Sequence, residues 1–238
     1  MRMVLLMNVI TSATVNPCIL LVQLDESFNQ RAKADLIEIG YTPVIVPEAH
    51  QALLEIKKQQ PAMIVIDRHR SKQAGFTLCR QLRKAQNRVL IIMVLEQESV
   101  EERVACLEAG VDDYILTAYH TENLLRLVHF YLTTAETVTE RLQFDNLILD
   151  LNNRQLFINE IAIDLTMKEF ELLKYLMSHP KEILTRDKIL ENVWGYDFQG
   201  ESNVIEVYIR YLRLKIESKN QRRLIHTVRG VGYVLREG

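Results

Sequence analysis

The chain has 238 residues, of which 48% are hydrophobic and 25% are charged, a composition typical of globular proteins and not of disordered ones. A net charge of −2 excludes a uniformly basic chain, and three cysteines without metal-ligand spacing (Cys18, Cys79 and Cys106) argue against a disulfide framework. No apolar run approaches the roughly 20 residues of a membrane span, so no membrane partner is expected. The length fits two domains, and the cysteine usage predicts a reduced, cytoplasmic protein.

The first half of the chain alternates runs typical of strands with runs typical of helices, after an N-terminal extension over residues 1–16. Strands are predicted at 18–22, 42–46, 62–66, 89–94 and 113–116, and helices at 27–39, 49–59, 76–84, 100–109 and 122–132. The first strand, Cys-Ile-Leu-Leu-Val, is continuously apolar, as expected when helices cover both faces of a parallel sheet. Five such units over residues 17–132 predict an α/β doubly wound (βα)5 domain, with its functional groups at the carboxyl ends of the strands.

The second half has a different rhythm and predicts a smaller α+β domain over residues 141–238. Residues 133–140 are polar and lack periodicity, which indicates a linker. Four short strands are predicted next, at 142–144, 147–151, 155–158 and 161–165, with turns at 152–153 and 159–160. Thr166 and Glu169 form a capping box that opens a helix ending at Ser178. A further helix begins at Thr185 and ends near Trp194.

A helix over residues 203–218 gives the clearest indication of function. One side carries a core-facing apolar stripe made of Ile205, Ile209, Leu212 and Ile216. The opposite side presents Asn203, Val207, Arg210 and Leu214, with Tyr211 at its edge. A helix that is anchored on one side and polar on the other can lie in a DNA major groove. Spacing alone leaves an ordinary surface helix as the alternative.

The distribution of charge favours the DNA-binding alternative. Residues 133–171 hold three basic and eight acidic side chains, whereas residues 207–236 hold eight basic and one acidic. The second segment includes a predicted β-hairpin, with Arg229 and Gly230 near its tip. A basic stripe confined to a helix and a hairpin is typical of binding to the phosphate backbone. Helix and hairpin together predict a winged-helix layout.

Motifs across nearly the whole chain resemble a known family. The segments Thr185–Gly195, Val204–Arg210 and Thr227–Tyr233 resemble the effector domain of OmpR/PhoB-type response regulators. The first half resembles the receiver domain of this family, with Gly75 eight residues after Asp67. A weaker resemblance links the chain to the atypical cyanobacterial regulators of the NblR type. The family resemblance implies a transcription regulator and not an enzyme, with double-stranded DNA, RNA polymerase and a second copy of the chain as partners.

The receiver-like half departs from the family at the positions that handle a phosphoryl group. The resemblance implies an acidic pair for Mg²⁺, a phosphoacceptor Asp, a Thr or Ser, and a Lys. Asp67 matches the phosphoacceptor, whereas the other positions hold Gln23 and Leu24, Leu95, and Thr117. Mg²⁺ needs hard oxygen ligands, and phosphoryl transfer needs metal and cationic stabilisation. We therefore predict a pseudo-receiver with a vestigial Asp67, without metal or cofactor, and this speaks against a cognate kinase. Such a domain is expected to work independently of phosphorylation, in dimerisation or in docking of a partner.

Two more features of the receiver-like half bear on its role. Asp25 lies one position beyond the expected acidic pair and is predicted to cap the first helix. On the face that pairs receivers in relatives, Ala105, Asn123 and Leu127 stand where charges are expected, which predicts a more apolar face and a constitutive homodimer. Other ion pairs there could come from Arg103, Asp112, Asp113 and Arg126.

Two alternatives stay open at this point. One is a regulator that senses redox state or a small ligand, through Cys79 or Cys106 or through the vacated acidic pocket. The other is a conventional response regulator that is phosphorylated on Asp67.

Roles on DNA follow from the resemblance together with helix geometry. Residues expected to approach base edges are Val204, Val207 and Tyr211, flanked by Asn203 and Arg210. Residues expected to position the DNA backbone are Arg186, Trp194, Tyr208, Arg213 and Thr227. Arg229 is expected to enter the minor groove, and Trp194 has the alternative of being a core aromatic.

Overall fold

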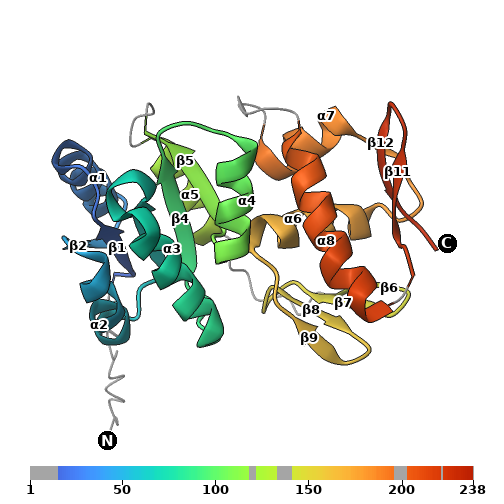
Figure 1. The fold of residues 1–238 in the computed structure, drawn as a ribbon, viewed down its shortest axis with the longest axis horizontal. Helices are drawn as coiled ribbons and strands as arrows, with labels where there is room; N and C mark the ends of the chain where they lie inside the picture. Colours follow the sequence, from blue (N-terminus) through green and yellow to red (C-terminus); the bar gives the residue numbers. More distant parts are fainter. Residues whose placement is uncertain (1–15, 118–121, 133–140, 196–202, 221, 238) are drawn as a thin grey trace, which may run out of the picture.

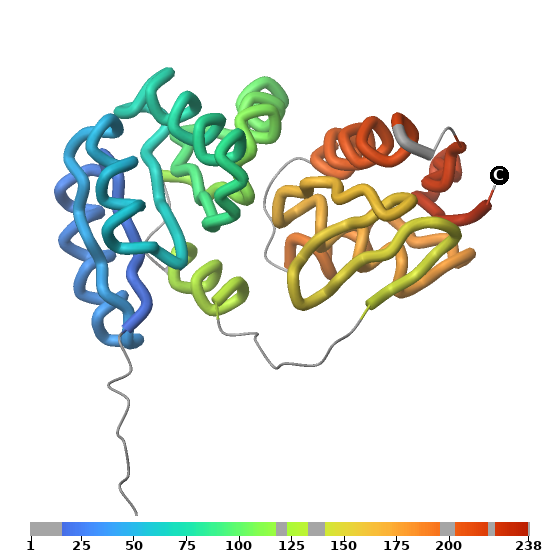
Figure 2. Tube along the Cα trace, turned by 90° about the horizontal axis from the view of Figure 1, so that it is seen from below, coloured from blue at the N-terminus to red at the C-terminus, as the bar shows by residue number. Residues whose placement is uncertain are grey.

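The computed structural model describes residues 16–117, 122–132, 141–195, 203–220 and 222–237. The predicted linker over 133–140 and all but the last residue of the predicted extension over 1–16 lie outside this part of the chain. An N-terminal and a C-terminal domain lie side by side (Figures 1 and 2). Within the described ranges, no helix combines the length and the apolar character that crossing a membrane requires.

The N-terminal domain is a parallel sheet between helices, as the sequence predicts. Its strands are β1 (Cys18–Val22), β2 (Thr42–Val46), β3 (Met63–Asp67), β4 (Leu90–Leu95) and β5 (Asp113–Leu116). All five strands are parallel, in the order β2-β1-β3-β4-β5. The chain adds β2 on one side of β1 and then β3, β4 and β5 on the other side. The helices are α1 (Glu26–Glu38), α2 (Ala49–Gln59), α3 (Arg68–Lys84), α4 (Val100–Ala109) and α5 (Glu122–Leu132). A pocket beside the carboxyl ends of the strands is the expected place for a site in this topology.

Alternation along the central strands explains why the sheet is covered on both faces. In β1, Ile19 and Leu21 belong to one apolar cluster, and Leu20 and Val22 belong to a second one. Successive side chains of a strand point to opposite faces, so each face of the sheet receives its own core. The continuously apolar sequence of β1 therefore reflects burial on both sides, as predicted.

Helix α3 begins earlier than the sequence predicts. The apolar pattern indicated a helix over 76–84, but α3 starts at Arg68, directly after β3, with a non-helical kink at Lys72 (φ 49°, ψ −130°). Asp67 caps this helix, because its carboxylate accepts a hydrogen bond from the backbone N–H of Arg70 at 2.8 Å. A Cβ atom at Gly75 would lie 2.2 Å from the Ser71 Oγ atom, so glycine permits this close passage.

The C-terminal domain starts with an antiparallel sheet in the order β6-β7-β8-β9. Its strands are β6 (Arg141–Phe144), β7 (Leu147–Asp150), β8 (Gln155–Ile158) and β9 (Ile161–Ile163), followed by α6 (Met167–Ser178). The capping box of Thr166 and Glu169 is present at the start of α6, as predicted. The predicted helix from Thr185 to Trp194 is split into α7 (Arg186–Ile189) and a π-helical turn, Leu190–Trp194.

Helix α8 (Val204–Asn220) and the hairpin of β11 (Ile225–Val228) and β12 (Gly232–Leu235) complete this domain. A two-residue strand that the sequence did not predict, β10 (Leu184–Thr185), pairs with β12 to give the order β10-β12-β11. A Cβ atom at Gly232 would lie 1.9 Å from the backbone oxygen of Leu184, so only glycine permits this strand pairing.

Candidate nucleic-acid interface and receiver pocket

Helix α8 is anchored by the apolar stripe that the sequence predicts. The four residues of the stripe are each at most 1% exposed: Ile205, Ile209, Leu212 and Ile216. On the opposite side, Arg210 is exposed and Leu214 is 56% exposed. The helix is therefore held on its domain core along one side and presents Arg210 and Leu214 to the outside along the other.

Hydrogen bonds fix the hairpin relative to α8. The guanidinium of Arg213 donates through Nε to the backbone oxygen of Ile225 at 3.0 Å and through Nη2 to the Thr227 Oγ1 atom at 2.9 Å. Arg229 is exposed at the hairpin turn, beside Gly230, whose φ of 72° lies in the left-handed region that favours glycine. Two predicted backbone-positioning residues, Arg213 and Thr227, thus bind each other and orient the hairpin.

Three residues that we predicted to contact DNA belong to the domain core in this conformation. Val204 is fully buried, Tyr208 is 3% exposed and Trp194 is 8% exposed. The rings of Trp194 and Tyr208 pack edge to face, with centroids 5.3 Å apart. Val204 and Tyr208 lie four residues apart on α8 and flank the apolar stripe, which explains their burial. In this conformation the three side chains pack in the domain core, which fits the core alternative for Trp194, and their contacts with DNA stay predictions.

The polar end of α8 lies against α4 of the N-terminal domain (Figure 1). The hydroxyl of Tyr211 donates to Glu108 at 3.0 Å, and the guanidinium of Arg103 donates to the side-chain oxygen of Asn203. Arg103 is 1% exposed and also forms an ion pair with Glu98 at 2.7 Å. Two residues that we predicted at or near base edges, Asn203 and Tyr211, are thus engaged within the chain.

A buried ion pair joins the two domains beside these contacts. Nζ of Lys168, on α6, lies 3.2 Å from Asp113 Oδ2 at the start of β5, and both side chains are under 10% exposed. The hydroxyl of Tyr131, on α5, donates to the same oxygen at 2.7 Å. Burial raises the pKa of Tyr131, and the neighbouring Asp113 carboxylate raises it further.

The adjacent residue, Asp112, holds the start of α6. Its Oδ1 atom accepts the backbone N–H of Met167 at 3.0 Å, and its Oδ2 atom pairs with Arg83 at 2.6 Å. Burial raises the pKa of Asp112, while Arg83 and the backbone donors oppose this effect. We call Arg103, Glu108, Asp112, Asp113 and Tyr131 the docking face.

The docking face corrects one expectation from the sequence. We expected that Arg103, Asp112 and Asp113 could form pairs across a dimer, but all three are at most 6% exposed and contact residues of their own chain. Leu127, expected to make the outer face more apolar, is 8% exposed and belongs to the core cluster. The apolar side chain of Leu127 therefore contributes to the core and not to an outer face.

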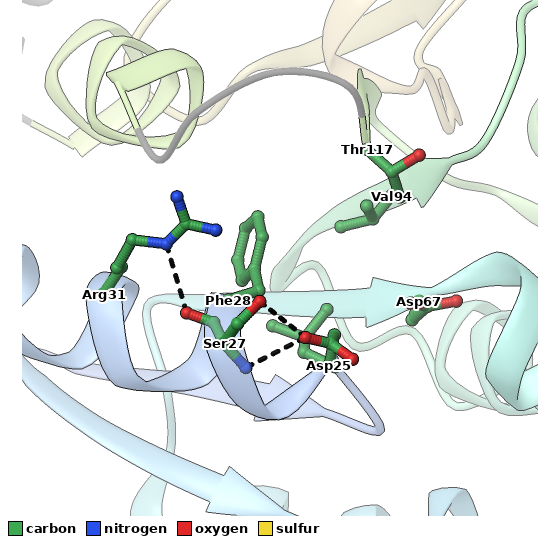
Figure 3. A pocket seen from close by; sticks show the side chains of 8 residues that line it. Asp25, Ser27, Phe28, Arg31, Asp67, Val94 and Thr117 are labelled. Carbon is green, nitrogen blue, oxygen red and sulfur yellow. Dashed lines mark hydrogen bonds between the residues drawn. The ribbon is translucent and has the colours of Figure 1, made fainter.

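A pocket of about 220 Å³ lies beside the carboxyl ends of the parallel strands (Figure 3). It is lined by Leu24, Asp25, Ser27, Phe28, Arg31, Asp67, Val94 and Thr117. Asp25 caps α1, as predicted, because its Oδ1 atom accepts the backbone N–H of Ser27 at 2.9 Å. The hydrogen bonds from Ser27 lower the pKa of Asp25. The pocket brings together Leu24, Asp67 and Thr117, three of the positions singled out in the sequence.

The remaining receiver positions supply little to this pocket. Leu95, at the end of β4, is 1% exposed and belongs to the apolar cluster of the sheet. The side-chain amide of Gln23 donates toward Glu48 at 3.4 Å. Sequence reasoning missed Arg70, whose guanidinium reaches Asp25 at 2.6 Å. Its place three residues after Asp67 at the start of a helix is a local signal, but the partner 45 residues away is not.

Metal and thiol chemistry find no support in the described part of the chain. No group of three or more His, Cys, Asp or Glu residues is arranged there to hold a metal ion. Cys79 and Cys106 are buried, and burial raises the pKa of Cys79 to about 12 and raises that of Cys106 as well. Because the thiolate is the reactive form, these thiols are inert near neutral pH in this conformation.

Family models match both halves of the chain. The model described as "Response regulator receiver domain" matches residues 19–129, and the model described as "Transcriptional regulatory protein, C terminal" matches residues 160–235. These ranges contain the parallel sheet with its pocket and the helix–hairpin unit with α8.

Two relatives are similar to this chain over nearly its whole length. "Response regulator MprA" of Mycobacterium bovis (strain BCG / Pasteur 1173P2) is 40% identical over 223 residues, which is 92% of this chain and 97% of that protein. The protein of the same name from Mycobacterium leprae (strain TN) is 39% identical over 225 residues, 92% of this chain and 98% of that one.

Two solved structures are similar over the whole length. A RitR mutant has a TM-score of 0.71 and 28% identity, covering 94% of this chain and 100% of its own. DrrB, described as a Thermotoga maritima OmpR/PhoB homolog, has a TM-score of 0.50 and 25% identity, covering 93% and 99%. The chain therefore belongs to the OmpR/PhoB-type response regulators, DNA-binding transcription regulators in which a receiver domain precedes a winged-helix domain.

Proposed function

We propose that this regulator binds double-stranded DNA through α8 and its hairpin, and that its receiver domain acts by docking on α8 without aspartyl phosphorylation. One observation carries the proposal: α8 lies against α4, with Tyr211 bound to Glu108 and Asn203 bound to Arg103. Since Tyr211 and Asn203 are the residues that we expect near base edges, docking and base contact compete for the same surface.

The proposed DNA contacts fall on residues that are exposed or only partly buried. Arg210 and Val207, on the outer side of α8, and Tyr211, once released, are proposed to face the bases. Exposed Arg229 is proposed to enter the minor groove, whose potential attracts guanidinium groups. Arg186, which pairs with Glu206 at the start of α8, together with Arg213 and Thr227 would set the register on the phosphate backbone.

Independence from phosphorylation is supported by the geometry around Asp67. One oxygen of this carboxylate caps α3, so the side chain already has a structural task. At the two positions where the resemblance implies a hydroxyl and a Lys to hold a phosphoryl group, Leu95 is a buried hydrocarbon and Thr117 carries no charge. The usual readout of phosphorylation therefore has no matching side chains at these positions.

Docking rather than dimerisation is the role that we propose for the docking face. Its charged residues are bound to α6 and α8 of the same chain, so two receivers could pair through them only after the domains separate. A homodimer, a contact with RNA polymerase, the lack of a cognate kinase and membership of the NblR-type subgroup stay predictions. Redox sensing through Cys79 or Cys106 is disfavoured, because burial raises the pKa of both thiols.

Receiver-side variants test the competition without touching a residue expected to meet DNA. Glu108→Ala removes the partner of Tyr211, and a hydrogen bond contributes about 0.5–1.5 kcal/mol. We expect operator affinity, on a site selected from random DNA, to rise by about two- to tenfold. Glu101→Ala is the matched control, because Glu101 is another exposed acid on α4, in its first turn, and Tyr211 binds Glu108 instead. Equal effects of the two variants would show that only charge matters and would refute docking.

A mass measurement tests phosphorylation independence separately. The full chain is treated with acetyl phosphate and Mg²⁺, and its intact mass is recorded. We expect no substantial phosphorylated species. A phosphoryl adduct that disappears in Asp67→Asn, together with a change in DNA affinity, would restore the conventional response regulator.

A further inference from the structure

Arg70 lies between the two carboxylates of the receiver pocket. Its Nη2 atom is 2.6 Å from Asp25 Oδ2, and its Nε atom is 3.8 Å from Asp67 Oδ2. Its backbone N–H also donates to Asp67 Oδ1 at 2.8 Å. Figure 3 shows the two acids on different elements, with Asp25 at the start of α1 and Asp67 at the end of β3. One residue thus contacts both acids and joins the two corners of the sheet.

The receiver fold implies a divalent cation at this place, and the side chains present do not fit one. Mg²⁺ takes about six oxygen ligands at about 2.0–2.1 Å, commonly including one or two carboxylates. Asp25 Oδ1 accepts both the backbone N–H of Ser27 and its hydroxyl, at 2.9 and 2.6 Å. Each carboxylate oxygen of Asp25 and Asp67 therefore faces a donor of the protein, and Oδ2 of Asp67 faces Arg70 at the longest distance.

The residues before Asp25 do not complete a metal site. Leu24 is a hydrocarbon and 6% exposed. Gln23 donates its amide toward Glu48, and its side-chain oxygen is buried without a hydrogen-bond partner. That oxygen is neutral, and Gln23 is not among the residues that line the pocket.

Charge at the pocket is already balanced. A guanidinium is permanently charged, and its planar donors suit a bridge between carboxylates. Arg31 lines the pocket, and its Nε atom donates to the backbone oxygen of Ser27 at 3.2 Å, while Arg70 contacts the two acids that line it. Two guanidinium groups therefore accompany the two carboxylates, which leaves no net negative charge to attract a dication.

We propose that Arg70 is a resident cation that takes the place of the divalent metal ion, bridging Asp25 and Asp67, and that the pocket consequently binds no divalent cation. This inference deepens the proposed function and rests on it, because a pocket with its own cation has no use for metal-dependent phosphoryl transfer. The proposal also explains why α3 begins as early as Arg68, because the first turn of this helix places Arg70 beside Asp25.

Binding of Mn²⁺ to the full chain tests the proposal, with the electron paramagnetic resonance signal of free Mn²⁺ as the readout. For the native chain we expect a Kd weaker than about 10 mM. Arg70→Met, which keeps the length and removes the charge, should bind at least about tenfold more tightly, equivalent to ~1.4 kcal/mol. Arg31→Met is the matched control, since it removes a charge that lines the pocket while leaving the bridge, and its affinity should stay near the native value.

A second variant ties any new site to the two carboxylates. Asp25→Asn, added to Arg70→Met, retains an oxygen that can cap α1 but removes a charge, so it should abolish the gained Mn²⁺ binding. Thermal unfolding provides an independent readout: Mn²⁺ should raise the midpoint of Arg70→Met and leave that of the native chain unchanged. Tight Mn²⁺ binding by the native chain, or equal gains in Arg70→Met and Arg31→Met, would overturn the proposal.

Failure of this inference and failure of the proposed function give different results. If the native chain binds Mn²⁺ but takes up no phosphoryl group from acetyl phosphate, Arg70 is not a resident cation and the proposed function stands. If the native chain excludes Mn²⁺ while its DNA affinity still depends on phosphorylated Asp67, the resident cation stands and phosphorylation independence fails.

Discussion

At the scale of single residues, Asp67 illustrates how a family position can keep its residue type and gain another task. Its carboxylate is 8% exposed, caps α3 and lies beside Arg70. Removal of this carboxylate should therefore lower the free energy of unfolding. We predict that Asp67→Ala lowers the free energy of unfolding by about 1 kcal/mol through the lost cap. Asp67→Asn keeps the accepting oxygen and should cost less. Chemical denaturation of both variants measures this difference.

The same pair of variants bears on signalling. DNA affinity and transcriptional output should stay close to those of the native chain in both, because Leu95 and Thr117 cannot read a phosphoryl group. A large loss of output in a stably folded Asp67→Asn protein would show that Asp67 still has a signalling role.

Residue-scale chemistry also predicts the behaviour of the thiols. With the pKa of Cys79 raised to about 12, about one thiol in ten thousand is ionised at pH 8. We therefore expect Cys79 and Cys106 to resist alkylation in the native chain and to react after unfolding, as mass spectrometry would record. Rapid labelling of either thiol in the native chain would revive the redox alternative.

The raised pKa of Cys79 also predicts how the stability of the fold depends on pH. In the unfolded chain a thiol ionises near pH 8.5–9, whereas the folded pKa of Cys79 is higher. The contribution of this group to stability is therefore fully present below about pH 8.5 and falls as the pH rises toward 12. Cys79→Ser removes the titrating thiol and should flatten this part of the pH dependence of the free energy of unfolding.

At the scale of elements, α8 and the hairpin should divide the work on DNA. Arg229→Ala is expected to weaken binding to most sequences, since a guanidinium in the minor groove reads mainly its width and potential. Tyr211→Ala and Val207→Ala should instead change which sequences are preferred, because a good base contact contributes ~1–3 kcal/mol of discrimination. An apolar Val and a Tyr favour thymine methyl groups, so we expect an A·T-leaning half-site.

Binding-site selection on random DNA with the three variants is the measurement. Tyr211→Ala also removes the contact with Glu108 that holds α8 against α4. The part of its effect on DNA affinity that comes from lost docking should therefore also be seen in Glu108→Ala. If Arg229→Ala changes sequence preference while Tyr211→Ala alters affinity alone, α8 is docked on DNA in another orientation.

At the scale of the whole molecule, the two domains share one apolar cluster, which runs from the parallel sheet through Val128 and Tyr131 to Phe144 and the core around α8. The fragment 134–238 nevertheless contains its own strands and helices, and we predict that it folds alone. Since no receiver covers α8 in the fragment, it should bind DNA more tightly than the full chain. Its affinity should fall steeply with salt, because basic side chains displace phosphate counterions.

Titration of fragment and full chain on the same DNA at several salt concentrations checks this prediction. Lys168→Met is an informative companion in the full chain, because it removes one partner of the buried pair with Asp113 and should loosen docking at some cost in stability. Salt-independent binding of the fragment, or binding weaker than that of the full chain, would contradict the proposed competition.

The sequence by itself determined the elements that local periodicity governs. The strand β1, the capping box of α6 and the buried stripe of α8 all lie where the spacing of apolar and capping residues predicts them. Such patterns are reliable because a strand or helix repeats its geometry every two or 3.6 residues. The cap at Asp25 was predictable for the same reason, since donor and acceptor lie two residues apart.

Only the tertiary structure decided which polar side chains meet. Arg70 finds Asp25 across 45 residues, Met167 finds Asp112 across 55, and Tyr211 finds Glu108 across 103. Periodicity says which side of a helix is polar but not what lies opposite, so α8 was expected to face DNA and lies instead against α4. Val204 and Tyr208 show the same limit, because their burial depends on packing partners that approach from other parts of the fold.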